Sequence, residues 1–367
     1  MSLKEASKKM LYLALIPGKN IGWGVCGANL IKEISMLHPC ELIPWKENQG
    51  GMEKFYPGPV FHTIGDHNLR KVFNVKGEEN YGYTFFENSI SEGAVESAKF
   101  FNIVFAGSTW CGERLEERGI SWTETLIQGV SPDIFHPLSF DKNSAKEQFV
   151  IFSGGKFELR KGQDLVIRAV KALQDRHKDV IFINLWFNPW KFSMDTMAGS
   201  GHIVYNPRGS AWSEIMGNIL FDNGLDLKRV IIGEQVAQHE LKNIYEVVNL
   251  GVFPNRCEGG TNLVLMEFMA CARPVIASWN TGHKDVLTSE NAILLEKMSR
   301  REILDPATQR IEAIWEEPDL DELIEKLEDA YQNRGVLKKT AERAGEDMRS
   351  WTWKRSAKDL LEKIDAF

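Results

Sequence analysis

The sequence lacks paired cysteines and long apolar runs. Only five of the 367 residues are cysteine, an odd number, and no two of them form a CxxC pair. This pattern excludes a disulfide framework and a zinc knuckle, and it predicts reduced thiols. No apolar run approaches the roughly 18 residues of a membrane span, and the polar N-terminus is unlike a signal peptide. We therefore expect a cytoplasmic protein, with peripheral attachment to a membrane surface left open.

An excess of positive charge is also missing. Lys and Arg number 44 against 51 Asp and Glu, which gives a formal net charge of −7. Proteins that bind nucleic acid regardless of sequence neutralise phosphates, so we expect no nucleic-acid partner. Hydrophobic residues at 43% and charged residues at 26% are typical of soluble globular proteins and exclude global disorder. The length predicts two domains of about 150 residues or more each.

Short strand-like runs alternate with helical patterns along most of the chain. In the first half, a strand ending at Ile16 precedes a glycine-rich turn and a helical pattern over residues 27–37. Residues 131–148 have two prolines and no sustained period, which predicts a domain boundary. The alternation predicts two doubly wound α/β domains with a ligand beyond their strand ends. The clearest strands of the second half are expected at 149–155, 179–187, 250–254 and 274–278.

A first glycine motif lies between the first strand and its helix. Gly22, Gly24 and Gly27 have the GxGxxG spacing of the dinucleotide fingerprint. In that fingerprint the first glycine directly follows the strand, whereas residues 17–21 intervene here. The acidic residue that should end the second strand and hold a ribose is also misplaced, because Glu41 precedes that strand. The motif predicts a glycine-rich turn or a phosphate-contacting loop, and it argues against nicotinamide binding.

A second motif places three cations after the strand at 149–155. Gly155 is followed by Lys156, Arg160 and Lys161 and then by a helical pattern. Glycine lets the backbone approach a ligand, ammonium groups suit phosphate oxygens, and the start of the next helix adds positive potential. The motif predicts a phosphate site, with a solvated basic loop as the alternative. A Walker loop is excluded because no GxxxxGK[ST] is present.

A third motif follows the strand at 250–254 and contains two glutamates. Glu258 lies in the turn, and Glu267 lies in the first turns of the next helix. Gly259 and Gly260 leave backbone N–H groups free at the helix start, where anions bind. Carboxylates beside an anion site suit the hydroxyl groups of a sugar or ribose. The alternative is a glycine turn before a helix whose dipole favours an early glutamate.

Together and in this order, the motifs resemble those of the GT-B retaining glycosyltransferases of family four, the group 1 glycosyl transferases. The resemblance covers most of the chain and is strongest over residues 149–287. It rests on the segments GGKFELRKGQDLVIRA, LKNIYEVVNLGVFPNRCEGGTNLVLMEFMACARPVIAS, STWCGERLEERGI and IQGVSPDIFHP. It implies GT-B architecture: a Rossmann-like acceptor-binding domain at 1–140, a Rossmann-like nucleotide-sugar-binding domain at 149–350, and a C-terminal helix at 351–367 that crosses back to the N-domain.

The resemblance implies roles for individual residues. Lys156 and Lys161 match the cationic pair that holds the donor diphosphate. Glu267 matches the glutamate that binds the donor ribose, and Glu258 the glutamate that faces the transferred sugar. The backbone of residues 236–238 occupies the place where the nucleobase is read. The other positions expected to contact the donor are Gly22, Gly24, Gly155, Arg160, Val236, Gln238, Gly259, Gly260, Thr261, Asn262 and Leu263.

The sequence departs from the family pattern at three places. Glu258 and Glu267 are nine residues apart rather than the family's eight, so we expect one residue to bulge out of the turn through Gly259 or Gly260. Ala272 stands where the family has a glycine. Glu87 lies where the family often has a histidine after the fourth N-domain strand, and it is either an acceptor-side catalytic base or a simple cap.

The resemblance implies transfer of a sugar from a UDP- or GDP-linked donor to a hydroxyl of a saccharide or lipid-linked saccharide, with retention of anomeric configuration. No cofactor and no metal are expected, because Lys156, Lys161 and helix N-termini would neutralise the leaving diphosphate. The sequence agrees, since it has no His/Asp cluster with metal-ligand spacing. The alternatives are a nucleotide-sugar epimerase, a non-catalytic nucleotide-sugar-binding protein and a nicotinamide oxidoreductase. The oligomeric state, the sugar, the base and the acceptor stay open.

Overall fold

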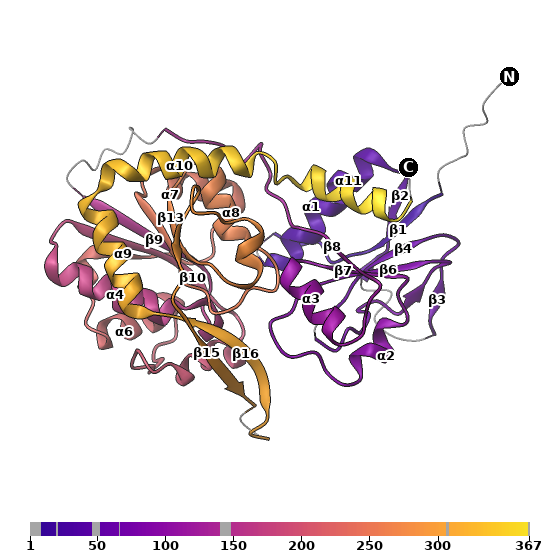
Figure 1. Ribbon diagram of the computed structural model, residues 1–367, viewed down its shortest axis with the longest axis horizontal. Coiled ribbons are helices and arrows are strands. Elements are labelled where there is room, and N and C mark those ends of the chain that lie inside the picture. The colour runs from indigo at the N-terminus through magenta and orange to yellow at the C-terminus, as the bar shows by residue number, and fades with distance from the viewer. Residues whose placement is uncertain are drawn as a thin grey trace. The chain divides into compact units, whose positions relative to one another are not determined.

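The computed structural model describes residues 9–19, 21–45, 52–65, 67–139, 148–305 and 308–365. Its contacts group the chain into two compact units (Figure 1). The first unit comprises Met1–Gly129, Gly259–Thr261 and Trp351–Phe367, and the second comprises Val130–Glu258 and Asn262–Ser350. Both units are doubly wound α/β structures, which confirms the predicted fold class. The predicted domain limits, 1–140 and 149–350, stay a prediction.

The first unit is built on a parallel six-stranded sheet with the order β2-β1-β4-β6-β7-β8. Strand β4 (Val60–Thr63) was not predicted, because half of its four buried residues are polar. The pair β3 and β5 forms a separate two-stranded sheet. The other elements are β1 (Leu11–Ala14), α1 (Gly22–Leu37), β2 (Cys40–Leu42), β3 (Lys54–Phe55), β5 (Val75–Lys76), β6 (Asn80–Thr84), α2 (Ala94–Ala98), β7 (Ile103–Ala106), α3 (Thr109–Glu117) and β8 (Thr123–Thr125).

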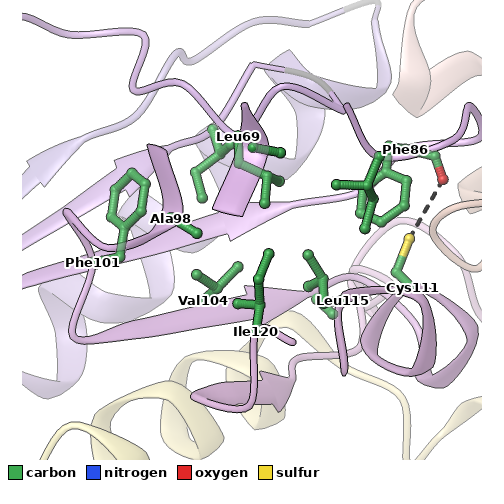
Figure 2. Close-up of a cluster of buried hydrophobic side chains, with 12 residues drawn as sticks. Leu69, Phe86, Ala98, Phe101, Val104, Cys111, Leu115 and Ile120 are labelled. Atoms are coloured by element: carbon green, nitrogen blue, oxygen red, sulfur yellow. Dashed lines mark hydrogen bonds between the residues drawn. The ribbon is translucent and has the colours of Figure 1, made fainter. Parts of the chain in front are cut away.

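Two apolar clusters fill the first unit. The larger one packs β7 against α2, α3 and the segments around them, and Figure 2 shows its side chains. The Cys111 thiol at its edge donates to the carbonyl of Phe86 (3.4 Å). The smaller cluster contains β1 and β4 side chains together with Tyr56 and Phe73. β1 and β7 read as continuous apolar runs because they are buried on both sides.

The last helix, α11 (Trp353–Lys363), belongs to the first unit and lies along α1, as Figure 1 shows. Its apolar side chains Trp353, Leu360 and Leu361 are buried. The Ser356 hydroxyl donates to the carbonyl of Ile127 (2.7 Å), and Lys363 pairs with Glu124 (2.7 Å). The predicted return of the C-terminal helix to the N-terminal fold is confirmed.

The second unit has a parallel six-stranded sheet with the order β11-β10-β9-β12-β13-β14. The strand order reverses direction between β9 and β12, which lie side by side. In such sheets a ligand binds beyond the carboxyl ends of the strands at this reversal. Its strands are β9 (Phe149–Lys156), β10 (Val180–Phe187), β11 (Val230–Ile232), β12 (Leu250–Phe253), β13 (Val275–Ser278) and β14 (Ile293–Leu295).

Helices cover the second sheet, and an antiparallel hairpin of β15 (Met298–Leu304) and β16 (Ile311–Pro318) extends from it (Figure 1). The hairpin was not predicted. Three helices, α9, α10 and α11, follow the hairpin to the end of the described residues. The helices of this unit are α4 (Gln163–Arg176), α5 (Lys191–Met194), α6 (Trp212–Asp222), α7 (Leu241–Glu246), α8 (Leu263–Ala270), α9 (Leu320–Gln332) and α10 (Arg334–Met348), with short 3₁₀ turns η2 (Leu159–Lys161), η3 (Asp195–Gly199), η4 (Leu227–Arg229), η5 (Gln238–Glu240) and η6 (Thr281–Asp285).

Candidate functional site

The loops that follow β9 and β12 meet at the strand reversal of the second unit. After Lys156 the chain forms the η2 turn, and Gly162 then turns it into α4 with a φ of +70°. A Cβ atom on Gly162 would lie 2.0 Å from the carbonyl oxygen of Pro254, which follows β12. Glycine is therefore required here both for its backbone conformation and for the close approach of the two loops.

Glu158, a residue that the motif analysis did not single out, holds two of the three cations of the first loop. Its carboxylate pairs with Lys156 (2.8 Å) and Arg160 (2.7 Å) and accepts a hydrogen bond from the Ser193 hydroxyl (2.6 Å). Burial alone would raise the pKa of Glu158, but Arg160 and Lys156 outweigh it and hold the pKa below its ordinary value. The predicted basic loop is thus an ordered ion-pair network.

Glu258 holds the third cation from the other loop. Its Oε1 pairs with Lys161 and Arg160 (3.1 Å) and accepts a hydrogen bond from Asn255. Burial would raise the pKa of Glu258, but Lys161 and Arg160 lower it to about 2, so the carboxylate is ionised at neutral pH. The contacts of the Glu258 carboxylate with Lys161, Arg160 and Asn255 all use Oε1. Glu258 is therefore anchored through this oxygen.

Three cations face two glutamates in this network. Lys161 donates one of its three ammonium N–H groups to Glu258, and burial lowers its pKa from the ordinary value despite that partner. Lys156 likewise has one carboxylate partner and lies over the ring of Trp190 (5.5 Å). Both ammonium groups therefore retain N–H donors that can bind phosphate oxygens.

Glu267, the second predicted glutamate, lies in α8 and is only 5% exposed. Its Oε1 accepts a hydrogen bond from the Gln238 side chain (2.5 Å), which comes from the η5 turn after β11. Burial raises the pKa of Glu267 to about 8, and the Gln238 hydrogen bond lowers it only partly. The structure thus brings together two predicted donor-binding residues, Glu267 and Gln238. Val236 lies half-buried two residues earlier.

The turn before α8 has an unusual backbone conformation. Asn262 at the helix start has a left-handed backbone with a φ of +62°, whereas Gly259 and Gly260 have no positive φ. The bulge expected at Gly259 or Gly260 stays a prediction. Ala272, in place of the family's glycine, also has a positive φ, +52°. An L-residue in this region is strained unless its surroundings hold it there.

Gly259, Gly260 and Thr261 are grouped with the first unit. The Gly259 N–H donates to Glu87 (3.4 Å), and the Gly259 carbonyl accepts a hydrogen bond from the Ser108 hydroxyl (2.7 Å). Glu87 is therefore a hydrogen-bond acceptor within this unit. Its predicted role as an acceptor-side base stays a prediction.

Gly22 and Gly24 do not form the expected loop, because α1 already begins at Gly22. A Cβ on Gly24 would lie 2.7 Å from the Cα of Gly18, and one on Gly27 would lie 2.4 Å from the carbonyl oxygen of Ile16. These two glycines are required for close packing of the helix start against the preceding turn. Gly22 is exposed at the helix start, with nothing near its Cβ position, so a contact of Gly22 with the donor stays a prediction.

A buried arginine just before the third motif was also missed. Arg256 has no exposed surface, and it pairs with Asp164 (2.7 Å) at the start of α4 and with Glu317 in the hairpin. Arg256 joins the two loops of the site to the hairpin in one ionic network.

No group of three His, Cys, Asp or Glu side chains among the described residues could hold a metal ion. No helix in the described segments is long and apolar enough to cross a membrane.

Comparisons with known proteins confirm the resemblance and the fold. A model of the family described as "Glycosyl transferases group 1" matches residues 207–312. The solved sucrose-phosphate synthase from Thermosynechococcus elongatus aligns with a TM-score of 0.64 at 13% identity and covers 98% of each chain. Anabaena HepE, solved in complex with UDP and glucose, aligns with a TM-score of 0.64 at 12% identity. The alignment covers 98% of this chain and 100% of the HepE chain. The N-terminal domain of Candida albicans trehalose-6-phosphate phosphatase aligns with a TM-score of 0.65 at 12% identity. The alignment covers 100% of this chain and 98% of that domain's chain. No curated protein sequence matches the chain.

Proposed function

We propose that this chain is a metal-independent retaining glycosyltransferase that moves a sugar from a nucleotide diphosphate to an acceptor hydroxyl. The observation that carries the proposal is the pair of loops at the strand reversal, where Lys156, Arg160 and Lys161 pair with Glu158 and Glu258. The helix that follows the second loop carries Glu267. The family match over 207–312 and the GT-B fold of HepE, solved with UDP and glucose, support it. UDP and GDP are the donor nucleotides to test first, and the acceptor is a saccharide or a lipid-linked saccharide.

Each residue has a distinct part in this proposal. Lys156 and Lys161 bind the diphosphate and stabilise the negative charge that grows on it as the bond to the sugar breaks. Glu267 accepts hydrogen bonds from the ribose hydroxyls, with Gln238 holding its other oxygen. The Glu258 carboxylate, which is anchored through Oε1, accepts a hydrogen bond at Oε2 from a hydroxyl of the transferred sugar. The leaving phosphate takes the acceptor proton, so the retaining step needs no dedicated base from the protein.

The transfer assay incubates the protein with UDP-glucose or GDP-mannose and a saccharide acceptor, and it follows the product's anomeric signal by NMR. The proposal predicts an acceptor-dependent product with the configuration of the donor. An inverted product would exclude retention. A changed donor sugar without any acceptor would instead indicate an epimerase, and nucleotide binding without either product would indicate a binding protein. Cytoplasmic location, with the acceptor in solution or at a membrane surface, belongs to the same proposal.

A further inference from the structure

The turn after β13 is hydrogen-bonded to the Glu258 loop at Asn255 and at Glu258. The Glu258 N–H donates to the Thr281 hydroxyl (2.8 Å), and the Gly282 N–H donates to the Glu258 carbonyl (3.0 Å). Ser278 and Asn280 side chains donate to the carbonyl of Asn255 at 2.6 and 3.0 Å. Both backbone polar groups of Glu258 are thus held by residues 281 and 282.

Thr281 adopts a backbone conformation that its side chain disfavours. Its φ is +40°, a region where a β-branched residue is an outlier and a glycine is unstrained. The residue is 7% exposed, and its hydroxyl also donates to Asn280 Oδ1 (3.2 Å). A glycine would make the same turn at lower cost, so what the threonine adds is the hydroxyl that receives the Glu258 N–H. A strained backbone conformation of this kind persists only where neighbouring contacts hold the residue in it, and such residues often lie at functional sites.

We propose that Thr281 is a positioning residue for the transfer reaction, which rests on the proposed function. Its hydroxyl fixes the backbone of Glu258, and the Glu258 carboxylate in turn fixes Lys161 and Arg160 where the diphosphate binds. Thr281 itself touches no substrate. Its effect on the reaction passes through the hydrogen bond from the Glu258 N–H and then through the ion pairs of the Glu258 carboxylate with Lys161 and Arg160.

Two substitutions test this proposal, with matched controls. Thr281→Val keeps the shape and removes the hydroxyl, which leaves the buried Glu258 N–H without a partner. Thr281→Ser keeps the hydroxyl and serves as the conservative rescue. Thr281→Gly removes both the hydroxyl and the strain, and it replaces the valine variant if that protein does not fold. Thr123→Val in β8 is the control for loss of a threonine hydroxyl elsewhere.

The first measurement is independent of activity. Acetylation of Lys161 by an N-hydroxysuccinimide ester, followed by mass spectrometry, reports whether the ion pair with Glu258 stays closed. We expect labelling of Lys161 to accelerate about tenfold or more in Thr281→Val and Thr281→Gly, and to match the wild type in Thr281→Ser and Thr123→Val. Equal labelling in all variants would overturn the proposal, as would equal acceleration in Thr281→Ser.

The second measurement is titration with UDP, GDP and ADP. We expect Thr281→Val to bind about tenfold more weakly than the wild type to any of these nucleotides that the wild type binds. Thr281→Ser should bind with the affinity of the wild type. Unchanged affinity in folded Thr281→Val would also overturn the proposal. If the wild type binds none of the three, the proposed function fails, while Lys161 labelling still decides whether Thr281 positions the pair.

Discussion

Glu267→Gln should make the protein more stable in alkaline solution while it weakens the binding of the donor. Burial raises the pKa of Glu267 to about 8, against 4.5 for an ordinary glutamate, and the structure provides only Gln238 to offset that burial. The difference corresponds to about 5 kcal/mol at most for the ionised form in the folded chain. A glutamine has the same shape, can still accept from Gln238, and never ionises.

The sign of the pH dependence follows from which state holds the proton. Below pH 4.5 both folded and unfolded chains hold it, so this group adds no pH dependence there. Between pH 4.5 and about 8 the unfolded chain has lost the proton and the folded chain keeps it, so the free energy of unfolding falls as pH rises. Above pH 8 the folded chain has also lost the proton, and the loss of unfolding free energy caused by Glu267 no longer grows. The variant lacks this fall, so its advantage over wild type grows between pH 5.5 and 8 and then levels off.

Urea denaturation of wild type and Glu267→Gln at pH 5.5, 7 and 9 measures this advantage. Glu258→Gln is the control with the opposite sign. The pKa of Glu258 is about 2, so its contribution is complete above pH 4.5 and is lost only as the pH falls from there toward 2. Its replacement should destabilise the protein by about 3–5 kcal/mol at all three pH values, because Lys161 is left buried and unpaired. A constant difference between Glu267→Gln and wild type across these pH values would refute the reasoning.

Three further predictions concern the framework of the site. Gly162→Ala should cost at least about 2 kcal/mol and weaken donor binding, because its Cβ would overlap the Pro254 carbonyl; unchanged stability by urea denaturation would contradict this. Arg256→Met should lower the free energy of unfolding by about 3–5 kcal/mol, because it leaves Asp164 buried without its partner. A clearly smaller loss in urea denaturation at neutral pH would contradict this. Leu360→Ala should cost about 2–5 kcal/mol from the cavity left under α11, and hydrogen exchange should show the loss in the first unit and not in the second.

The sequence predicted the second unit better than the first for a physical reason. Its central strands are long, buried on both faces and followed by amphipathic helices, so the change of period from strand to helix is visible in the residues of β9 and α4. In the first unit, β4 has a buried histidine and a threonine among four residues. Its polarity hides it, because burial there depends on neighbouring strands that lie far away in sequence.

The candidate site was predicted as a set of residues but not as a network. Lys156, Lys161, Glu258 and Glu267 could be found because each lies in a motif beside glycines. Which glutamate pairs with which lysine could not be found, because the pairing depends on the register of β9 against β12 and on the turn at Gly162.

The contribution of Thr281 was also missed. It lies more than twenty residues beyond Glu258, and only a folded sheet brings the ends of β12 and β13 together. The same holds for Arg256, whose partners come from α4 and from a hairpin that the sequence pattern did not reveal.

The central claim is that the loops after β9 and β12 bind the diphosphate of a nucleotide-sugar donor. Calorimetric titration of wild type, Lys156→Ala and Lys161→Ala with UDP and GDP tests it most directly. We predict that the wild type binds at least one of the two nucleotides. Each alanine variant should lose about 1.5–3 kcal/mol of binding free energy, while Thr123→Val binds as the wild type does. Failure of the wild type to bind either nucleotide, or equal binding by folded Lys156→Ala and Lys161→Ala, would contradict the account.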